Sequence, residues 1–314
     1  MNPALRVEKP GLFTTLQDLG RPHHRSSGVP VGGAMDRFAL VAANRLVGNP
    51  DGAGALEIAL AGPTLVALCG CLVAITGGDL QPAVNGEEVP GWTSLYLAEG
   101  DRLSFGARRL GARAYLALAG GIAGDRWLGS VSLYRLVARG GIQGRPLRAG
   151  DELELAADPP RPLVTGRSLA GRFHPRYCGR GGAEVQAIPG PQLISHLSPA
   201  SRKLFFSQSY ELTTDADRMG FRLEGEPLEI RGPEMISFGL AFGCVQVPWS
   251  GKPILLMADH QTAGGYPVAA GVIRADLPLA AQLLPGDRMT FTETTIEAAQ
   301  QRWRELRAGL DEIR

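Results

Sequence analysis

Short apolar runs separated by glycine and proline turns recur along most of the chain. Residues 55–59, 64–68 and 72–76 form three such runs, and residues 96–105 and 114–119 form two more. Short runs bounded by turn residues are typical of β-strands. The pattern therefore predicts a mainly β protein built from many short strands.

Only a few segments have helical periodicity. Asp36 is suited to cap a helix over residues 37–47, and Ser198-Pro199 predicts a short helix that ends near Phe206. The clearest helix is C-terminal, where apolar residues step by three and four and form a narrow seam (Ile296, Ala299, Trp303, Leu306, Leu310, Ile313). The seam is too short for a stable coiled coil. We therefore expect this helix to dock on the body of the protein or on a partner chain.

A turn followed by an alternating strand occurs three times. In each copy a Gly-Asp pair precedes the strand, in residues 98–105, 148–155 and 284–291. A second parallel is that Ala34-Met-Asp36 and Arg274-Ala-Asp276 each precede a predicted helix. These repeats favour two related barrel domains.

The segment between the repeats sets the predicted domain boundaries. Residues 161–183 are rich in proline, glycine and arginine and have no periodicity, which is typical of a linker or a long excursion. The expected domains are therefore residues 1–160 and residues 184–314. The second of them includes the terminal helix.

Composition narrows the class of protein. The 314 residues include 42 glycines and 23 prolines, which suits many turns, and 32 basic against 31 acidic residues give a net charge of +1. The chain has no cluster of basic residues of the kind that binds nucleic acid or an anionic membrane. The first fifteen residues lack a signal-peptide core, and the longest apolar run, residues 65–75, is too short to span a membrane. A cytoplasmic location is expected.

Neither metal ligation nor a common catalytic motif is expected. The four cysteines (Cys69, Cys71, Cys178 and Cys244) do not have the spacing of a zinc site or a redox pair. The chain has no phosphate-binding loop, no HExxH, no GxSxG and no GxGxxG pattern. Polar loops on a β scaffold favour binding and polarisation of a substrate over covalent catalysis.

The densest polar stretch lies at residues 259–267, where an acid, a histidine, an amide and a hydroxyl precede a Gly-Gly pair. In extended backbone, Asp259 and His260 would point to opposite faces, so they are not expected to form an acid–base dyad. His260 would share a face with Thr262, and Gln261 would share one with Asp259. A structural role and a catalytic role for His260 both remain open. The backbone at Gly264-Gly265 would allow N–H groups to converge on an oxygen.

Three further segments carry candidate site residues. Arg218 could clamp a carboxylate, or it could pair with Asp215 or Asp217. Residues 17–21 are either part of a site or a loop closed by an Asp18–Arg21 ion pair. Gly77-Gly78-Asp79 at the end of a buried strand is either a turn or a place where backbone approaches a ligand. We expect the first domain to contribute 17–21 and 77–79 to one wall of the site, facing 217–220 and 259–267.

Several motifs occur together and in order along almost the whole chain. In the first half they are residues 11–22 (GLFTTLQDLGRP), 28–36 (GVPVGGAMD), 44–49 (NRLVGN) and 56–58 (LEI). In the second half they are residues 189–192 (PGPQ), 217–220 (DRMG), 246–248 (QVP), 259–262 (DHQT), 264–267 (GGYP) and 275–278 (ADLP). This set resembles the biotin-dependent carboxyltransferase family of the allophanate hydrolase subunit 2 type.

The resemblance implies a fold and a function. It implies two cyclophilin-like β-barrel domains and a cleft for a small amide or lactam. Family members include the C subunit of an ATP-dependent 5-oxoprolinase, which opens 5-oxoproline to glutamate. Others are the carboxyltransferase part of urea carboxylase, which moves carboxylate from carboxybiotin, and an antagonist of a kinase inhibitor protein. The leading expectation is the hydrolase component, active in a complex, and the other two are alternatives.

The resemblance also implies partners, cofactors and site residues. The first partner would be a B subunit of the allophanate hydrolase subunit 1-like type, and a LamB/YcsF-like A subunit would be a second. ATP with magnesium would act through the complex, and biotin would be supplied by a partner. The expected catalytic residues are His260, Asp259 and Arg218. The expected substrate-binding residues are Gln17, Asp18, Arg21, Asp36, Gly77, Gly78, Asp79, Gln246, Gln261, Thr262, Gly264, Gly265 and Tyr266.

The chain departs from the family pattern at three positions. Val131 stands where the family has an arginine, Phe238 lies where it has an acidic or small residue, and Ala263 stands where it commonly has a threonine. The change at Val131 removes a contact to an anion. A diverged substrate, or a paralogue with a different activity, would fit these departures.

Overall fold

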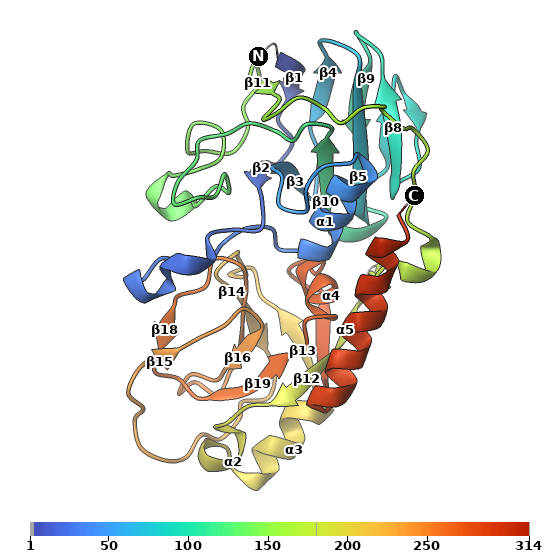
Figure 1. Cartoon of the computed structure of the whole chain (residues 1–314). Coiled ribbons are helices and arrows are strands. Elements are labelled where there is room, and N and C mark those ends of the chain that lie inside the picture. The colour runs from blue at the N-terminus through green and yellow to red at the C-terminus, as the bar shows by residue number, and fades with distance from the viewer. Residues whose placement is uncertain (1–2, 180, 314) are drawn as a thin grey trace. The chain divides into compact units, whose positions relative to one another are not determined.

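The computed structural model describes residues 3–179 and 181–313, which form two compact units (Figure 1). Unit 1 contains the chain up to Arg21, residues 32–175 and the end of the chain from Arg307. Unit 2 contains residues 22–31 and 176–306. The main division, after residue 175, lies inside the segment predicted as a linker. Unit 2 additionally takes a short piece of the N-terminal half.

Unit 1 is built from two antiparallel sheets. The six-stranded sheet has the order β11-β1-β4-β9-β6-β7, with bounds β1 (Pro3–Lys9), β4 (Thr64–Ala67), β6 (Pro82–Val84), β7 (Glu87–Glu88), β9 (Arg102–Phe105) and β11 (Glu152–Glu154). The five-stranded sheet has the order β2-β3-β10-β5-β8, with bounds β2 (Phe13–Gln17), β3 (Ala55–Ala59), β5 (Cys71–Asp79), β8 (Thr93–Leu97) and β10 (Leu110–Leu118). Alternating side chains of both sheets, such as Leu5, Leu65, Leu56 and Leu116, form one buried core between them.

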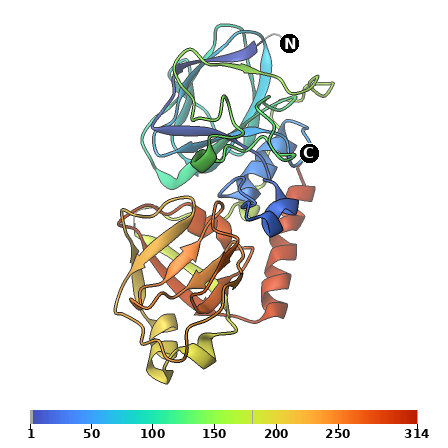
Figure 2. The same ribbon diagram turned by 90° about the vertical axis from the view of Figure 1, so that its left-hand side faces the viewer.

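Unit 2 is a closed seven-stranded barrel (Figure 2). Its order is β12-β19-β16-β17-β14-β13-β20, with bounds β12 (Gly182–Pro189), β13 (Ser209–Leu212), β14 (Gly220–Glu224), β16 (Cys244–Gln246), β17 (Ile254–Leu256), β19 (Val268–Val272) and β20 (Arg288–Glu293). The barrel closes through the parallel pairing of β12 with β20. A separate two-stranded ladder joins β15 (Phe238–Gly239) to β18 (Ala263–Gly264). Closure leaves the barrel strands without free edges.

The helices are few and mostly short. They are η1 (Pro22–Ser27), α1 (Arg37–Leu46), η2 (Arg135–Val137), η3 (Gly171–Phe173), α2 (Leu193–His196), α3 (Pro199–Ser207), α4 (Leu277–Ala281) and α5 (Ile296–Asp311). The mainly β fold with a C-terminal helix is thus confirmed, although barrel closure is complete in unit 2 whereas unit 1 has two separate sheets. None of the described helices is long and apolar enough to cross a membrane.

The predicted helix caps are present. The Asp36 carboxylate accepts a hydrogen bond from the Ala39 N–H at 2.9 Å, and the Ser198 hydroxyl accepts one from the Ser201 N–H. Asp276, at the parallel position before α4, does not cap its helix. Its carboxylate instead accepts the Gln186 N–H at 2.8 Å. The two positions are alike in sequence but play different structural roles.

The three Gly-Asp turns are the same structure. In each, the aspartate carboxylate accepts the backbone N–H three residues earlier, at 2.8 Å for Asp101, 2.8 Å for Asp151 and 3.0 Å for Asp287. The preceding glycines have φ of 86–89°, which a residue with a side chain adopts only with strain. The repeat seen in the sequence is therefore a recurrent turn that leads into β9, β11 and β20.

The segment predicted as a linker is partly ordered against unit 1. Arg167 O accepts the Ser94 N–H at 2.8 Å, and the Gly166 N–H binds Ser94 O at 2.9 Å, so this segment runs along the edge strand β8. The His174 ring then stacks on Trp92, with ring centroids 4.5 Å apart. Residues 164–174 thus cover an edge of the five-stranded sheet and do not form a loose connection.

Candidate functional site

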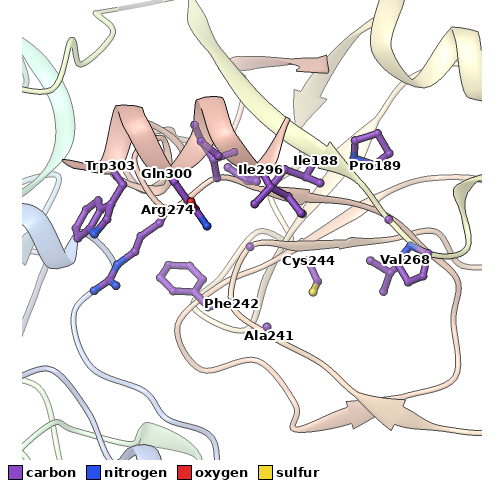
Figure 3. Close-up of a pocket in the computed structure, with 17 residues that line it drawn as sticks. Ile188, Pro189, Ala241, Phe242, Cys244, Val268, Arg274, Ile296, Gln300 and Trp303 are labelled. Carbon is purple, nitrogen blue, oxygen red and sulfur yellow. The ribbon is translucent and has the colours of Figure 1, made fainter. Parts of the chain in front are cut away.

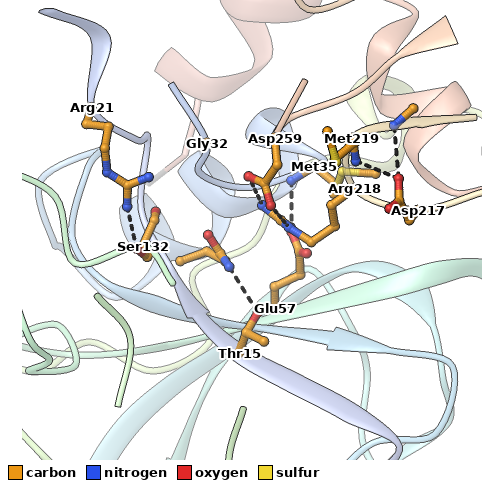
Figure 4. A network of polar contacts seen from close by, with 12 residues as sticks. Thr15, Arg21, Gly32, Met35, Glu57, Ser132, Asp217, Arg218, Met219 and Asp259 are labelled. Carbon is orange, nitrogen blue, oxygen red and sulfur yellow. Dashed lines mark hydrogen bonds and ion pairs between the residues drawn. The ribbon is translucent and has the colours of Figure 1, made fainter. Parts of the chain in front are cut away.

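The polar stretch of unit 2 begins with an ion pair between Arg218 and Asp259. Arg218 Nε lies 2.8 Å from Asp259 Oδ2, and Nη2 lies 3.2 Å from Oδ1 (Figure 4). Both side chains are largely buried. The Asp259 N–H also binds Arg218 O at 2.8 Å. The sequence left open whether Arg218 clamps a carboxylate or pairs with Asp215 or Asp217. The structure pairs it with Asp259, and the Asp217 carboxylate accepts the N–H groups of Met219 and Gly220.

The backbone at Asp259 and His260 is a tight turn, not an extended strand. The His260 N–H binds Met257 O at 3.1 Å. The buried imidazole makes a 2.6 Å hydrogen bond from Nδ1 to Gln261 O, and because a carbonyl only accepts, Nδ1 carries the hydrogen. In the neutral ring the lone pair is then on Nε2. The hydrogen on Nδ1 of His260 is therefore used by Gln261 O.

Two glutamines connect this turn to the barrel. Gln261 Nε2 donates to Gln246 Oε1 at 3.0 Å, and the buried Gln246 donates through Nε2 to Tyr266 O at 3.2 Å. Three of the predicted residues, Gln246, Gln261 and Tyr266, are therefore brought together. The chain of amides fixes the orientation of both glutamine carboxamides.

The glycine pair has a role in packing. Gly264 lies in β18 opposite Phe238, and a side chain there would place Cβ 2.9 Å from Leu240 Cδ1 and 3.1 Å from Gln246 Nε2. At Gly265 a Cβ would meet Met235 O at 2.9 Å. Neither glycine has a left-handed φ, which an anion-binding nest of backbone N–H groups requires. The expectation that these N–H groups converge on an oxygen is not supported, and Gly264 instead makes room for Gln246.

Cavities in unit 2 lie near some of these residues. Tyr266 lines a cavity of about 340 Å³ together with Arg222, Lys252 and Asp215. A second cavity, of about 510 Å³, lies between α5 and the strands β12, β16 and β19, and its lining is mostly apolar (Figure 3). Arg274 borders this second cavity with its guanidinium 4.2 Å from the Trp303 ring centroid. None of the predicted site residues lines the larger cavity.

In unit 1, Asp18 is held by four donors. Its buried carboxylate accepts hydrogen bonds from the hydroxyls of Ser130 (2.6 Å) and Ser132 (2.5 Å) and from the N–H groups of Val131 (2.8 Å) and Gly20 (2.7 Å). The Asp18 N–H in turn donates to Ser132 Oγ at 2.8 Å. This arrangement ties the end of β2 to residues 130–132.

Arg21 lies beside the same segment. Its Nη2 donates to Ser132 O, and its guanidinium is 5.0 Å from the Trp127 ring centroid and 5.9 Å from that of Tyr134 (Figure 4). The side chain is 1% exposed, so the charge is held inside the protein by a carbonyl and two aromatic faces. Asp18 and Arg21 thus both bind Ser132, and these contacts close the loop that the sequence left open as either an ion-paired loop or part of a site.

A buried polar row under α1 was missed by sequence reasoning. The Tyr115 hydroxyl donates to Glu57 Oε2 at 2.7 Å and accepts the Asp36 N–H at 2.8 Å, while the Met35 N–H binds Glu57 Oε2 at 2.8 Å. Burial, followed by the charges of Glu57 and Asp36, raises the pKa of Tyr115 well above its usual value. The only sequence signal was an acid between the core residues Leu56 and Ile58, and such an acid normally faces solvent. Asp36 belongs to this row and to the cap of α1.

The predicted wall made of residues 17–21 and 77–79 does not form. Gln17 pairs with Ala55 at one end of the five-stranded sheet, whereas Phe13 pairs with Ala59 at the other end. The register of β10 locates Asp79. Arg113 of β10 pairs with Ala59, at the Phe13 end of the sheet, and Leu110, three residues earlier on β10, pairs with Asp79. Asp79 therefore lies at the Phe13 end. The two predicted segments are therefore at opposite ends of the sheet.

Local packing explains residues 77–79. Gly77 has a φ of 82°, and a side chain there would put Cβ 2.5 Å from Arg113 O, so the glycine allows β5 to lie against β10. Gly78 is a buried residue of β5. Asp79 pairs with Arg109 at 3.0 Å. The close backbone approach predicted here is to the protein's own strand.

Gln17, Thr262 and the three positions that depart from the family pattern remain to be placed in the structure. Gln17 is fully buried, with Nε2 3.1 Å from Thr15 Oγ1, and within the described residues its Oε1 has no hydrogen-bond partner. Thr262 uses its backbone O to accept the Leu240 N–H at 3.0 Å. Of the departures from the family pattern, Val131 packs in the core of unit 1, Phe238 pairs with Gly264, and Ala263 is exposed.

The chain is similar to one known protein family and to several proteins of known name. The model of the carboxyltransferase domain, subdomain A and B, matches residues 27–293. The 5-oxoprolinase C subunit of Escherichia coli is 36% identical over 94% of this chain and 93% of its own, and that of Haemophilus influenzae is 34% identical over 96% and 94%. The urea amidolyase of Saccharomyces cerevisiae is 30% identical over 95% of this chain but only 17% of its own.

The solved structures add a second line of similarity. The Kluyveromyces lactis urea amidolyase superposes over 100% of this chain and 20% of its own, with a TM-score of 0.94 and 27% identity. The protein TTHA0988 superposes over 92% of this chain and 55% of its own, with a TM-score of 0.79 and 37% identity. In both structures the matched region is part of a longer chain.

Proposed function

Because the chain belongs to the carboxyltransferase domain family, subdomains A and B, we propose that it is the C subunit of an ATP-dependent 5-oxoprolinase. Such an enzyme opens the cyclic amide of 5-oxoproline to give glutamate. The observation that carries the proposal is the 36% identity to the Escherichia coli 5-oxoprolinase C subunit, which extends over nearly the whole of both chains. The substrate is accordingly a small lactam, and activity requires the complex.

The turn at residues 259–261 supplies the groups that ring opening requires. A proton must leave the attacking nucleophile, and the departing ring nitrogen must gain one. The His260 imidazole, with Nδ1–H held on Gln261 O, has its lone pair at Nε2 and is the candidate general base. The Arg218–Asp259 pair holds the turn in place, so these two residues act as positioning residues.

The amide pair suits recognition of a lactam. A lactam offers one N–H donor and one C=O acceptor, and a carboxamide offers the complementary acceptor and donors. Gln246 and Gln261 are oriented by their mutual hydrogen bond and by Tyr266 O. We assign them to substrate orientation, with Thr262 and Tyr266 beside them.

ATP and magnesium are assigned to a partner protein of the complex. Among residues 3–179 and 181–313 no group of three or more His, Cys, Asp or Glu side chains is arranged to hold a metal ion. The chain also lacks a phosphate-binding loop. We therefore propose a heteromer with a B subunit of the allophanate hydrolase subunit 1-like type and with a LamB/YcsF-like A subunit.

A carboxyltransferase role is the second candidate. It is supported by the TM-score of 0.94 to the Kluyveromyces lactis urea amidolyase, which superposes over 100% of this chain. In that role the chain would take carboxylate from carboxybiotin and transfer it to urea or a related amide. Biotin would come from a partner, because none of the chain's three lysines, Lys9, Lys203 and Lys252, lies in an Ala-Met-Lys-Met sequence.

One experiment separates the two functions. The chain is co-purified with the A and B subunits, and ATP hydrolysis and glutamate release are measured with 5-oxoproline or with urea plus a biotin carboxylase. Stimulation by 5-oxoproline is expected. His260→Ala should lower the rate more than tenfold with the complex intact, whereas His23→Ala, on the exposed surface of η1, should leave it unchanged. No stimulation of the complete complex by 5-oxoproline would refute the proposal.

A further inference from the structure

The smaller cavity of unit 2 is built on the hairpin of β13 and β14. Its volume is about 340 Å³, and it is lined by residues of that hairpin, by residues between 248 and 254, and by Tyr266. The Thr213 N–H binds Arg222 O at 3.0 Å, and Arg222 pairs with Ile254 of β17, so the hydrogen bonds of the barrel hold these walls in place. A cavity of this size suits a small molecule, and it is named here the Arg222 cavity.

Two cations and two anions line the Arg222 cavity (Arg222, Lys252, Asp215 and Glu224). Lys252 Nζ lies 2.7 Å from Glu224 Oε1, so these two side chains neutralise each other. Within residues 3–179 and 181–313, neither the Arg222 guanidinium nor the Asp215 carboxylate forms a hydrogen bond or an ion pair. One positive and one negative group therefore border the same cavity without being paired.

These two charges define the chemistry of a matching ligand. A guanidinium binds a carboxylate through two parallel N–H groups, and a carboxylate accepts charge-assisted hydrogen bonds from an ammonium group. A ligand with a single charge would satisfy only one of the two side chains. An α-amino acid carries a carboxylate and an ammonium on the same carbon atom, and it therefore satisfies both.

We propose that the Arg222 cavity binds an α-amino acid as a zwitterion, with its carboxylate on Arg222 and its ammonium on Asp215. The choice of glutamate as this amino acid rests on the proposed function, because glutamate is the product of that reaction. The substrate 5-oxoproline also has a carboxylate, but its ring nitrogen is a neutral amide and forms no ion pair with Asp215. The cavity therefore distinguishes the product from the substrate.

Tyr266 links the Arg222 cavity to the residues assigned to the lactam. It lines the cavity, and its carbonyl accepts a hydrogen bond from Gln246 Nε2 at 3.2 Å. Gln246 also pairs across the barrel strands with Ile254, which is another lining residue. Glutamate bound in the cavity is therefore held beside the amide pair formed by Gln246 and Gln261.

The test measures binding of L-glutamate and of 5-oxoproline to the purified full chain by isothermal titration calorimetry, without ATP or partner subunits. Glutamate should bind at least tenfold more tightly than 5-oxoproline, because only glutamate supplies an ammonium for Asp215. Arg222→Gln should weaken the binding of both ligands at least tenfold. Asp215→Asn should weaken the binding of glutamate and not that of 5-oxoproline.

The variants have a matched control and a check on folding. Arg231→Gln removes an exposed arginine that pairs with Glu229 outside the cavity, and this variant should bind glutamate as the wild type does. Arg222→Gln and Asp215→Asn should both keep the wild-type melting temperature, because neither side chain has a partner within the described part of the chain.

The inference and the proposed function fail in different measurements. A wild-type chain that does not bind glutamate, or variants that bind it as tightly as the wild type, would overturn the inference and leave the proposed function intact. Equal affinities of the wild type for glutamate and 5-oxoproline would overturn the role of Asp215. A complete complex that 5-oxoproline does not stimulate would refute the proposed function, whereas glutamate binding that both variants weaken would still support the amino-acid site.

Discussion

Arg218 and Asp259, 41 residues apart in the sequence, form a two-point ion pair with distances of 2.8 Å and 3.2 Å. Asp259→Asn keeps the shape but removes the charge that faces the buried guanidinium. Removing one partner of a buried pair costs about 3–5 kcal/mol, and we expect a loss of that order. Thermal unfolding of the isolated chain measures the loss.

A matched pair checks this interpretation. Asp217→Asn makes the same chemical change at an exposed aspartate, whose carboxylate accepts the N–H groups of Met219 and Gly220. It should cost far less than Asp259→Asn. Equal losses for the two variants would show that the Arg218–Asp259 pair does not hold the turn.

Gly264 should not tolerate a side chain. In Gly264→Ala the new Cβ would lie 2.9 Å from Leu240 Cδ1 and 3.1 Å from Gln246 Nε2, so it should displace the Gln246 carboxamide. We expect the KM for the lactam to rise more than kcat falls. Gly271→Ala is the control, because a Cβ there meets nothing within 4 Å and the residue lies in β19. A Gly264→Ala enzyme with the KM of the Gly271→Ala enzyme would exclude Gln246 from substrate binding.

The carboxylate of Asp18 should be important for the stability of unit 1. Asp18→Asn exchanges an acceptor of four hydrogen bonds for a group with one acceptor oxygen and an NH2 that faces donors. Hydrogen bonds to a charged group are worth about 1.5–3 kcal/mol each, so a loss of about 3 kcal/mol is expected by denaturant unfolding. Asp125→Asn, at an exposed position seven residues after Leu118, should be neutral.

The stability of unit 1 should depend on the protonation of His174. Burial against Trp92 lowers the pKa of His174 below its ordinary value, so the unfolded chain binds the proton more readily than the folded one. The contribution to stability is therefore complete above the unfolded pKa of about 6.5 and is lost as the pH falls through the lower folded value. Unfolding midpoints of the wild type and His174→Gln, compared from pH 7.5 to pH 5, should converge on acidification.

Trp92 provides an independent readout of the same event. The stacked rings are 4.5 Å apart, so protonation of the imidazole should quench the indole fluorescence before unfolding. His23→Gln, at an exposed site, should retain the wild-type response. Identical pH profiles for the wild type and His174→Gln would rule out this linkage.

Local sequence determined much of the scaffold. The Gly-Asp turns, the caps at Asp36 and Ser198 and the strand runs depend on residues within a few positions of each other, and their hydrogen bonds form as predicted. The same local reasoning identified the polar turn at residues 259–262 as a candidate centre of chemistry. It gave the wrong conformation there, because alternation was assumed where a turn forms.

The tertiary structure decided which polar groups meet. Asp18 finds Ser130 and Ser132, 112 and 114 positions away, and Glu57 finds Tyr115 directly opposite it on the neighbouring strand. Strand register placed residues 77–79 at the end of the sheet opposite to Gln17, which no periodicity in the sequence could indicate. Pairing and register depend on the packing of distant strands, whereas turns and caps depend on neighbours. The sequence by itself therefore determined the elements and the family, and only the folded chain determined the partners of its charged side chains.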